Sequence, residues 1–154
     1  MIRQAQLLVV TQFILFAILA GTFMVLPTGQ VLWARLLGLG LLALGLGLVM
    51  LSILTQAWVN KNLVKMSPEP NTRNQLVQTG IYAFVRHPIY TGVIAVGLGT
   101  ALVHGHPVAL LIAIIICAFF TYKSTFEERL LMQAYPDYAA YRTRAGRFFP
   151  RLLG

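Results

Sequence analysis

The sequence predicts an all-α integral membrane protein with four transmembrane helices, the last two forming a hairpin, and a short C-terminal interfacial helix. Of the 154 residues, 58% are apolar and only 10% are charged, whereas soluble domains carry about 25% charged residues. The stretches 4–34, 36–60 and 87–122 contain no Lys, Arg, Asp or Glu. A membrane-spanning helix needs about 20 such residues. Prolines and glycines divide these stretches where turns are expected.

The first helix is expected from about Leu7 to Leu26, where a Pro-Thr-Gly run ends it. We interpret it as a retained helix and not a cleaved signal peptide, because no convincing Ala-x-Ala-like site follows it. The second helix is expected from about Val31 to Trp58. Within it, small residues recur at spacings of three and four at Gly40, Ala43 and Gly47. This pattern is typical of close helix contact.

The third stretch divides into a hairpin at the turn signal His104-Gly-His-Pro107. Its helices are expected from about Pro88 to Val103 and from about Pro107 to Ala134. The first covers only about 24 Å, less than the ~30 Å hydrocarbon core. We therefore expect it to reach the far interface without clearing it. A last short helix is expected from Pro136 to Ala145, because proline opens it and a glycine follows it.

Basic residues predict the orientation. With the N-terminus inside, eleven of the twelve Lys and Arg residues fall on the inner side and only Arg35 falls outside. Cytoplasmic loops of membrane proteins carry such an excess. We therefore expect both termini and the active site on the cytoplasmic side of the cell inner membrane. The net charge of +8 indicates contact with anionic lipid headgroups rather than nucleic acid.

The chain is expected to have two parts within one structural domain. Residues 1–60 form a two-helix membrane scaffold, because no ionisable group in them faces the bilayer interior. Residues 61–154 form the catalytic part, which comprises a cofactor loop, the hairpin and the C-terminal helix. The loop 61–86 has little periodicity, and such long loops are uncommon unless they cover a site. Because it contains apolar residues such as Tyr82, we expect it to fold over a ligand.

Ionisable residues meet at the inner end of the hairpin. The run Arg86-His87-Pro88-Ile89-Tyr90 begins one helix, and Glu127-Glu128 lies at the matching depth of its antiparallel partner. An ionised carboxylate costs free energy in a membrane unless a cation needs it. Neighbouring helical residues point about 100° apart. One Glu should therefore face the hairpin, and the other should face water or Arg129.

Other polar residues have simpler interpretations that compete with a ligand-binding role. Lys123 lies four residues before Glu127 on the same helix face, which permits an ordinary ion pair instead of a ligand role. We interpret His104 and His106 as interface polar residues, since too few further ligands lie near them for a metal. No metal site is expected. The sequence also lacks the motifs of a phosphate loop or a Ser-His-Asp arrangement.

Four linked motifs occur in order over about residues 70–152. They are Gly80-x-Tyr82-x-x-x-Arg86-His87-Pro88-x-Tyr90-x-Gly92, Glu127-Glu128-x-x-Leu131, Tyr138-x-x-Tyr141 and Arg147-x-x-Pro150. Together they resemble the isoprenylcysteine carboxyl methyltransferase family, which is related to membrane phospholipid methyltransferases. The resemblance implies methyl transfer from S-adenosylmethionine inside a helix bundle that has no Rossmann domain.

The resemblance also implies roles for individual residues. Lys123 corresponds to the position that meets the substrate carboxylate in the eukaryotic enzymes, which carry Arg there. A Lys keeps the charge but lacks the two-donor fork. Lys123, Glu128 and Arg86 are the candidate catalytic residues, with His87 or Glu128 as proton acceptor if the substrate is an amine. The implied cofactor contacts are Asn74, Gln75, Leu76, Val77, Tyr82, His87, Pro88, Ile89, Tyr90 and Glu127.

The predicted function is therefore an S-adenosylmethionine-dependent methyltransferase with a lipophilic or lipid-anchored acceptor, such as the carboxylate of a prenylated cysteine. One alternative is a phospholipid N-methyltransferase of the phosphatidylethanolamine type. Alternatives of other classes are an NADPH-dependent membrane reductase and a non-catalytic membrane scaffold. The paired glutamates favour the methyl donor, and the cost of the polar cluster argues against a scaffold. The sequence leaves the oligomeric state open.

Overall fold

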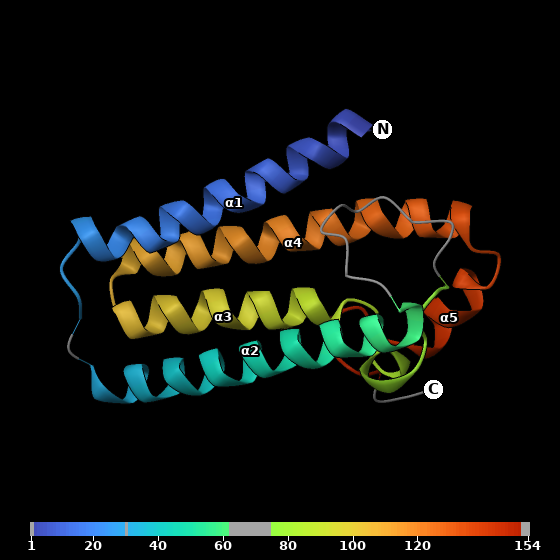
Figure 1. The fold of residues 1–154 in the computed structure, drawn as a ribbon. Coiled ribbons are helices and arrows are strands. Elements are labelled where there is room, and N and C mark those ends of the chain that lie inside the picture. The colour runs from blue at the N-terminus through green and yellow to red at the C-terminus, as the bar shows by residue number, and fades with distance from the viewer. Residues whose placement is uncertain (1, 30, 62–74, 152–154) are drawn as a thin grey trace.

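The computed structural model describes residues 2–29, 31–61 and 75–151. Figure 1 shows the long helices side by side, with a short helix at one end. The long helices are α1 (Ile2–Val25), α2 (Leu32–Asn60), α3 (Pro88–His104) and α4 (Pro107–Ala134). The 3-10 helix η1 (Gly80–Ala83) precedes α3, and α5 (Tyr138–Arg144) follows α4. The predicted all-helical class is confirmed.

Three of the helices are long and apolar enough to cross a membrane. Their mean hydropathies are 2.3 for α1, 2.5 for α2 and 2.0 for α4. The apolar helix α3 has 17 residues, which corresponds to about 26 Å, and it lies between α2 and α4 in Figure 1. Large apolar side chains cover the outward surfaces of α1 and α2, as expected of helices whose solvent is lipid.

The ends of the hairpin helices follow from backbone chemistry. Pro88 and Pro107 stand in the first turns of α3 and α4, where the missing N–H would have no helical partner. Gly105 ends α3 with a φ of 75°, a left-handed conformation that glycine adopts without steric cost. The side chain of His106 accepts a hydrogen bond from the Val108 N–H at 3.2 Å, and so caps α4.

α2 packs closely on α3 through glycines of both helices. A Cβ atom on Gly45 would lie 2.6 Å from the carbonyl oxygen of Gly92, and one on Gly38 would lie 2.7 Å from that of Gly99. Backbones can approach this closely only where side chains are absent. These four glycines therefore fix the position of α3 against α2, and with it the position of the residues that begin α3.

The small-residue stripe expected to make such a contact was the wrong one. Ala43 is exposed, and nothing lies within 4 Å of a Cβ atom built on Gly40 or Gly47. The error has a physical cause, because α2 is apolar on all sides and its pattern does not distinguish a lipid-facing side from a protein-facing side.

Replacing Gly45 with valine is expected to destabilise the bundle by about 1–3 kcal/mol, the usual cost of overpacking. The new side chain would collide with the backbone of α3. Thermal unfolding of the detergent-solubilised protein measures this effect. Gly47→Val, on the open side of the same helix, is the matched control and should unfold like the wild type. Equal unfolding temperatures for both variants would contradict the packing described here.

The two ends of the bundle differ in character. At the α3–α4 turn, the Gly29 N–H donates to the His104 carbonyl at 2.7 Å. His104 is fully buried, with Nε2 3.0 Å from the Thr22 carbonyl oxygen, so its side chain is held by the protein, and its place at the membrane interface stays a prediction. The opposite end gathers the C-terminal ends of α2 and α4, the start of α3, η1 and α5 (Figure 1).

Candidate functional site

The residues that precede α3 are held by the C-terminal segment. The Gly146 N–H donates to the Phe84 carbonyl at 2.9 Å, and the N–H groups of Arg86 and His87 donate to the carbonyls of Gly146 and Arg147 at 2.8 and 3.1 Å. This short parallel bridge joins parts of the chain that are distant in sequence. It fixes the backbone of the two residues that the sequence placed in the site.

Glu128 lies at the centre of a buried ion cluster. Its Oε1 accepts from Arg86 Nε and Nη2 at 3.0 and 2.9 Å, and its Oε2 lies 3.3 Å from Arg147 Nη2 and 3.6 Å from Arg142 Nε. Arg86 also donates to the carbonyl of Ala145. A buried carboxylate is tolerated when cations and hydrogen bonds surround it in this way. The cluster therefore anchors the C-terminal segment on α4.

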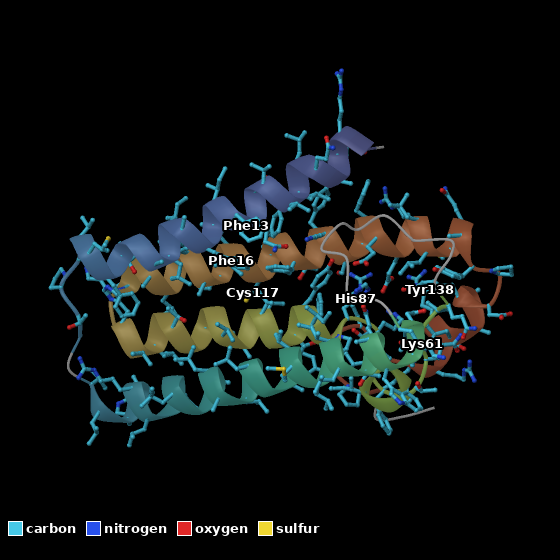
Figure 2. The ribbon with its side chains drawn as sticks, viewed as in Figure 1. Phe13, Phe16, Lys61, His87, Cys117 and Tyr138 are labelled. Carbon is cyan, nitrogen blue, oxygen red and sulfur yellow. The ribbon has the colours of Figure 1, made fainter. Side chains whose placement is uncertain are left out.

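His87 lies between the two glutamates. Its Nδ1 is 3.6 Å from Glu127 Oε2, and its Nε2 is 3.3 Å from Glu128 Oε1. The ring stacks on Tyr90 with 5.4 Å between centroids and 5° between planes. Both carboxylates thus reach the hairpin, contrary to the expectation that one faces away. One imidazole can contact both carboxylates because each of its two ring nitrogens lies near a different one. In Figure 2, His87 lies at the end of the bundle away from the α3–α4 turn.

Glu127 has a buried carboxylate oxygen that makes no hydrogen bond. Its Oε2 lies 3.6 Å from His87 Nδ1, but it accepts no hydrogen bond from the described residues. Burial raises the pKa of Tyr82 above its usual range; the hydrogen bond from Gln56 opposes this shift, and the Glu127 charge adds to it. Tyr82 is therefore a neutral phenol close to Glu127. A buried carboxylate oxygen that lacks a hydrogen bond costs free energy unless a ligand supplies a donor.

Lys123 is 1% exposed, and its surroundings are mostly apolar and aromatic. Its Nζ donates to Gln12 Oε1 at 2.6 Å and lies 5.3 Å from the ring centroid of Tyr90 and 5.7 Å from that of Phe120. Cation–π attraction operates at these distances. No carboxylate of the described residues lies within 4.0 Å of Nζ. The ion pair with Glu127 is not formed, and the ammonium keeps donors that no carboxylate uses.

Two site residues come from the half of the chain interpreted as scaffold. Gln12 of α1 binds Lys123, and Gln56 of α2 donates to the Tyr82 hydroxyl at 2.8 Å. Sequence reasoning missed both because it looked for ionisable groups only. The signal was nevertheless present, since a glutamine inside a membrane helix seeks a hydrogen-bond partner in the protein.

The remaining expected cofactor residues lie around η1 and the start of α3. The Gln75 N–H donates to Asn60 Oδ1 at 2.8 Å, and Val77 and Pro88 are buried. Leu76 packs against the tyrosines of α5. Ile89 is half-buried, and Asn74 lies outside the described residues. The cofactor contacts of this group, and the catalytic roles of Arg86, Lys123 and Glu128, stay predictions.

α5 holds η1 against the rest of the site. The Tyr141 hydroxyl donates to the Tyr82 carbonyl at 2.6 Å, and Tyr138 packs edge-on against Tyr141. Burial raises the pKa of Tyr141 to about 12, so the phenol keeps the proton that makes this bond. Figure 2 shows Tyr138 at the same end of the bundle as His87.

Comparison with known proteins gives consistent matches. Residues 33–138 match the family model described as phospholipid methyltransferase. The protein-S-isoprenylcysteine O-methyltransferase of Schizosaccharomyces pombe is 40% identical over 76 residues, which cover 48% of this chain and 32% of the relative. Protein-S-isoprenylcysteine O-methyltransferase B of Arabidopsis thaliana is 30% identical over 114 residues, which cover 73% of this chain and 57% of the relative.

A solved structure matches almost the whole chain. It is that of the eukaryotic intramembrane Ras methyltransferase, an isoprenylcysteine carboxyl methyltransferase, with a TM-score of 0.65 and 25% sequence identity. The match covers 96% of this chain and 52% of the solved one, so the chain spans about half the length of that protein. The resemblance found in the motifs is confirmed. The chain belongs to the phospholipid methyltransferase family and is related within it to the isoprenylcysteine carboxyl methyltransferases.

Proposed function

We propose that the protein is a membrane methyltransferase that uses S-adenosylmethionine to methylate the carboxylate of a lipophilic acceptor, such as a prenylated cysteine. The observation that carries the proposal is the buried Glu127 oxygen that accepts no hydrogen bond from the described residues, located one helical turn from the Lys123 ammonium. The two side chains offer separate subsites of opposite charge. The relatives named above act on isoprenylcysteine, which supports this choice of acceptor.

The residues around Glu127 fit the methyl donor. Glu127 can accept from the ammonium of the methionine moiety, and Tyr82 and Tyr90 supply aromatic surface close to the same carboxylate. When bound, the donor supplies a methyl group activated on a sulfonium, a cation that aromatic faces attract. The protein's main contribution is alignment, since holding reactants in attack geometry is worth about 7–11 kcal/mol.

The environment of Lys123 favours an anionic acceptor. A buried ammonium is costly. Here one neutral amide and two aromatic rings contact it directly, while the Glu127 carboxylate acts on it only from a longer range. An acceptor carboxylate would complete its coordination. A carboxylate is also already a nucleophile, so its methylation needs no proton acceptor.

A phospholipid N-methyltransferase is the second candidate, and the description of the matching family favours it. An amine acceptor must lose a proton before it can attack, and His87 beside two carboxylates is placed to take it. The buried charge of Lys123 argues against this candidate, because it repels a protonated lipid amine.

Replacing Glu127 with alanine is expected to weaken binding of S-adenosylhomocysteine by about tenfold or more, since a charge-assisted hydrogen bond contributes about 1.5–3 kcal/mol. Calorimetry of the purified protein in detergent measures this affinity. Gln133→Ala, at an exposed position of α4, is the control and should bind like the wild type. An unchanged affinity in Glu127→Ala would remove Glu127 from the cofactor site. Binding of NADPH instead would support the reductase alternative.

We further propose that the site and both termini face the cytoplasm. Apart from the site contacts of Gln12 and Gln56, residues 1–60 serve as scaffold and residues 61–154 carry the chemistry. The charge asymmetry of the sequence supports this orientation. In a variant lacking Cys117, a cysteine at the exposed Val108 beside the α3–α4 turn should react with a membrane-impermeant reagent in intact cells. A cysteine at the exposed Ala139 of α5 should react only after lysis. The opposite pattern would invert the topology.

A further inference from the structure

α1 lies before the residues that match the family model, yet it reaches the candidate acceptor subsite. Gln12 is on the face of α1 that meets α4. Phe16, one turn later, stacks on Phe120 of α4 with 6.1 Å between centroids. Leu19, a further turn on, is buried in the core. Figure 2 shows Phe16 between α1 and α4. The position of Gln12 is therefore set by helix packing.

Gln12 and Lys123 form a hydrogen-bonded pair in which the lysine is the donor and the glutamine is the acceptor. Gln12 Oε1 accepts from Lys123 Nζ at 2.6 Å. This bond orients the amide, so that its NH₂ group, with two donor hydrogens, lies beside the ammonium. Among the described residues, Lys123 is the side-chain partner that the structure gives Gln12. Ammonium and amide thus present N–H donors next to each other at one place.

We propose that Gln12 and Lys123 together bind the acceptor carboxylate, each donating to one of its two oxygens. A lysine alone is a point charge that grips one oxygen, whereas a carboxylate is recognised best by two parallel donors. The amide of Gln12 supplies the second donor, so that two helices provide the fork that one arginine provides by itself. This inference rests on the proposed carboxylate acceptor.

The test compares the binding of two ligands that differ in charge. One is an N-acetylated S-prenyl cysteine with a carboxylate, and the other is its neutral methyl ester. Their affinities are measured for the full chain in detergent, and the affinity of S-adenosylhomocysteine is measured in parallel. The wild type should prefer the carboxylate. Gln12→Leu should lower this preference by about tenfold, the effect of losing one charge-assisted hydrogen bond, and should leave S-adenosylhomocysteine affinity unchanged.

Two further variants separate recognition from packing. Gln12→Glu keeps the size of the side chain but pairs with Lys123, so it should abolish the preference for the carboxylate while ester binding persists. In Lys123→Arg, the guanidinium supplies both donors. The double variant Lys123→Arg/Gln12→Leu should therefore differ from Lys123→Arg by less than about twofold in its preference for the carboxylate. Gln6→Leu, at an exposed position of α1, is the matched control and should behave like the wild type.

The outcomes distinguish this inference from the proposed function. If Gln12→Leu and Gln12→Glu keep the carboxylate preference, or lower the affinities for carboxylate and ester equally, Gln12 is a packing residue and the inference is overturned. A wild type that binds S-adenosylhomocysteine but prefers the ester also overturns it, while leaving methyl transfer intact. A wild type that binds no S-adenosylhomocysteine, but whose preference for the carboxylate is lost in Gln12→Leu, supports the pair and overturns the methyltransferase assignment.

Discussion

Glu128→Ala is expected to leave little folded protein. Three guanidinium groups and an imidazole surround this one carboxylate, which is 3% exposed. Removing it leaves the buried Arg86 guanidinium without a counter-charge, and breaking such a buried pair costs about 3–5 kcal/mol. Because whole domains are stable by only about 5–15 kcal/mol, this loss is large. The C-terminal segment should detach first, since Arg142 and Arg147 join it to α4 through Glu128.

The measurements are thermal unfolding in detergent and protease cleavage after α5. Arg129→Ala changes the exposed neighbour and should match the wild type in both. Glu128→Gln keeps the shape but not the charge, and should fall between wild type and Glu128→Ala. If Glu128→Ala unfolds like the wild type and loses only activity, the residue has a catalytic role and the anchoring role described here is wrong.

Lys123→Met is expected to raise the apparent KM for a carboxylate acceptor by about tenfold to a hundredfold, the loss of about 1.5–3 kcal/mol of charge-assisted binding. Methionine has a similar length and suits the aromatic surroundings of Tyr90 and Phe120. The fold should therefore persist, and stability should not fall, because an apolar group replaces a buried cation.

Initial-rate kinetics with a prenylated cysteine measure this effect, and calorimetry with S-adenosylhomocysteine serves as the internal control. Lys123→Arg should retain activity, because a guanidinium grips a carboxylate with two hydrogen bonds. Reduced cofactor affinity with an unchanged acceptor KM would place Lys123 in the donor subsite. Methylation of lipid amines but of no prenylated cysteine by the wild type would reject the carboxylate acceptor.

Helix positions were predictable from the sequence because the signals that set them are local. Proline cannot occupy a helix interior without cost, and Pro88 and Pro107 open helices in the structure as expected. The convergence of Arg86 with Glu128 followed from the antiparallel hairpin, which brings the start of one helix beside the end of the next.

Which side of a helix faces protein was not predictable in the same way. In water, polar residues mark the outer face of a helix, but lipid leaves both faces apolar. The sequence alone therefore does not distinguish Gly45 from Gly47, although Gly45 contacts α3 and Gly47 has open space around it. The partner of Lys123 was missed for a related reason. Glu127 was the nearest acceptor along the helix, whereas Gln12 is near only after α1 packs on α4.

The backbone pairing of Arg86 and His87 with Gly146 and Arg147 has a consequence for biosynthesis. A chain emerges from the ribosome at about 5–20 residues per second, and its N-terminal parts become available first. Gly146 and Arg147 follow Arg86 and His87 by about 60 residues, so they are synthesised well after them. His87 therefore acquires its final backbone partners only when these later residues have emerged, and the polar cluster at this end of the bundle is completed late in synthesis.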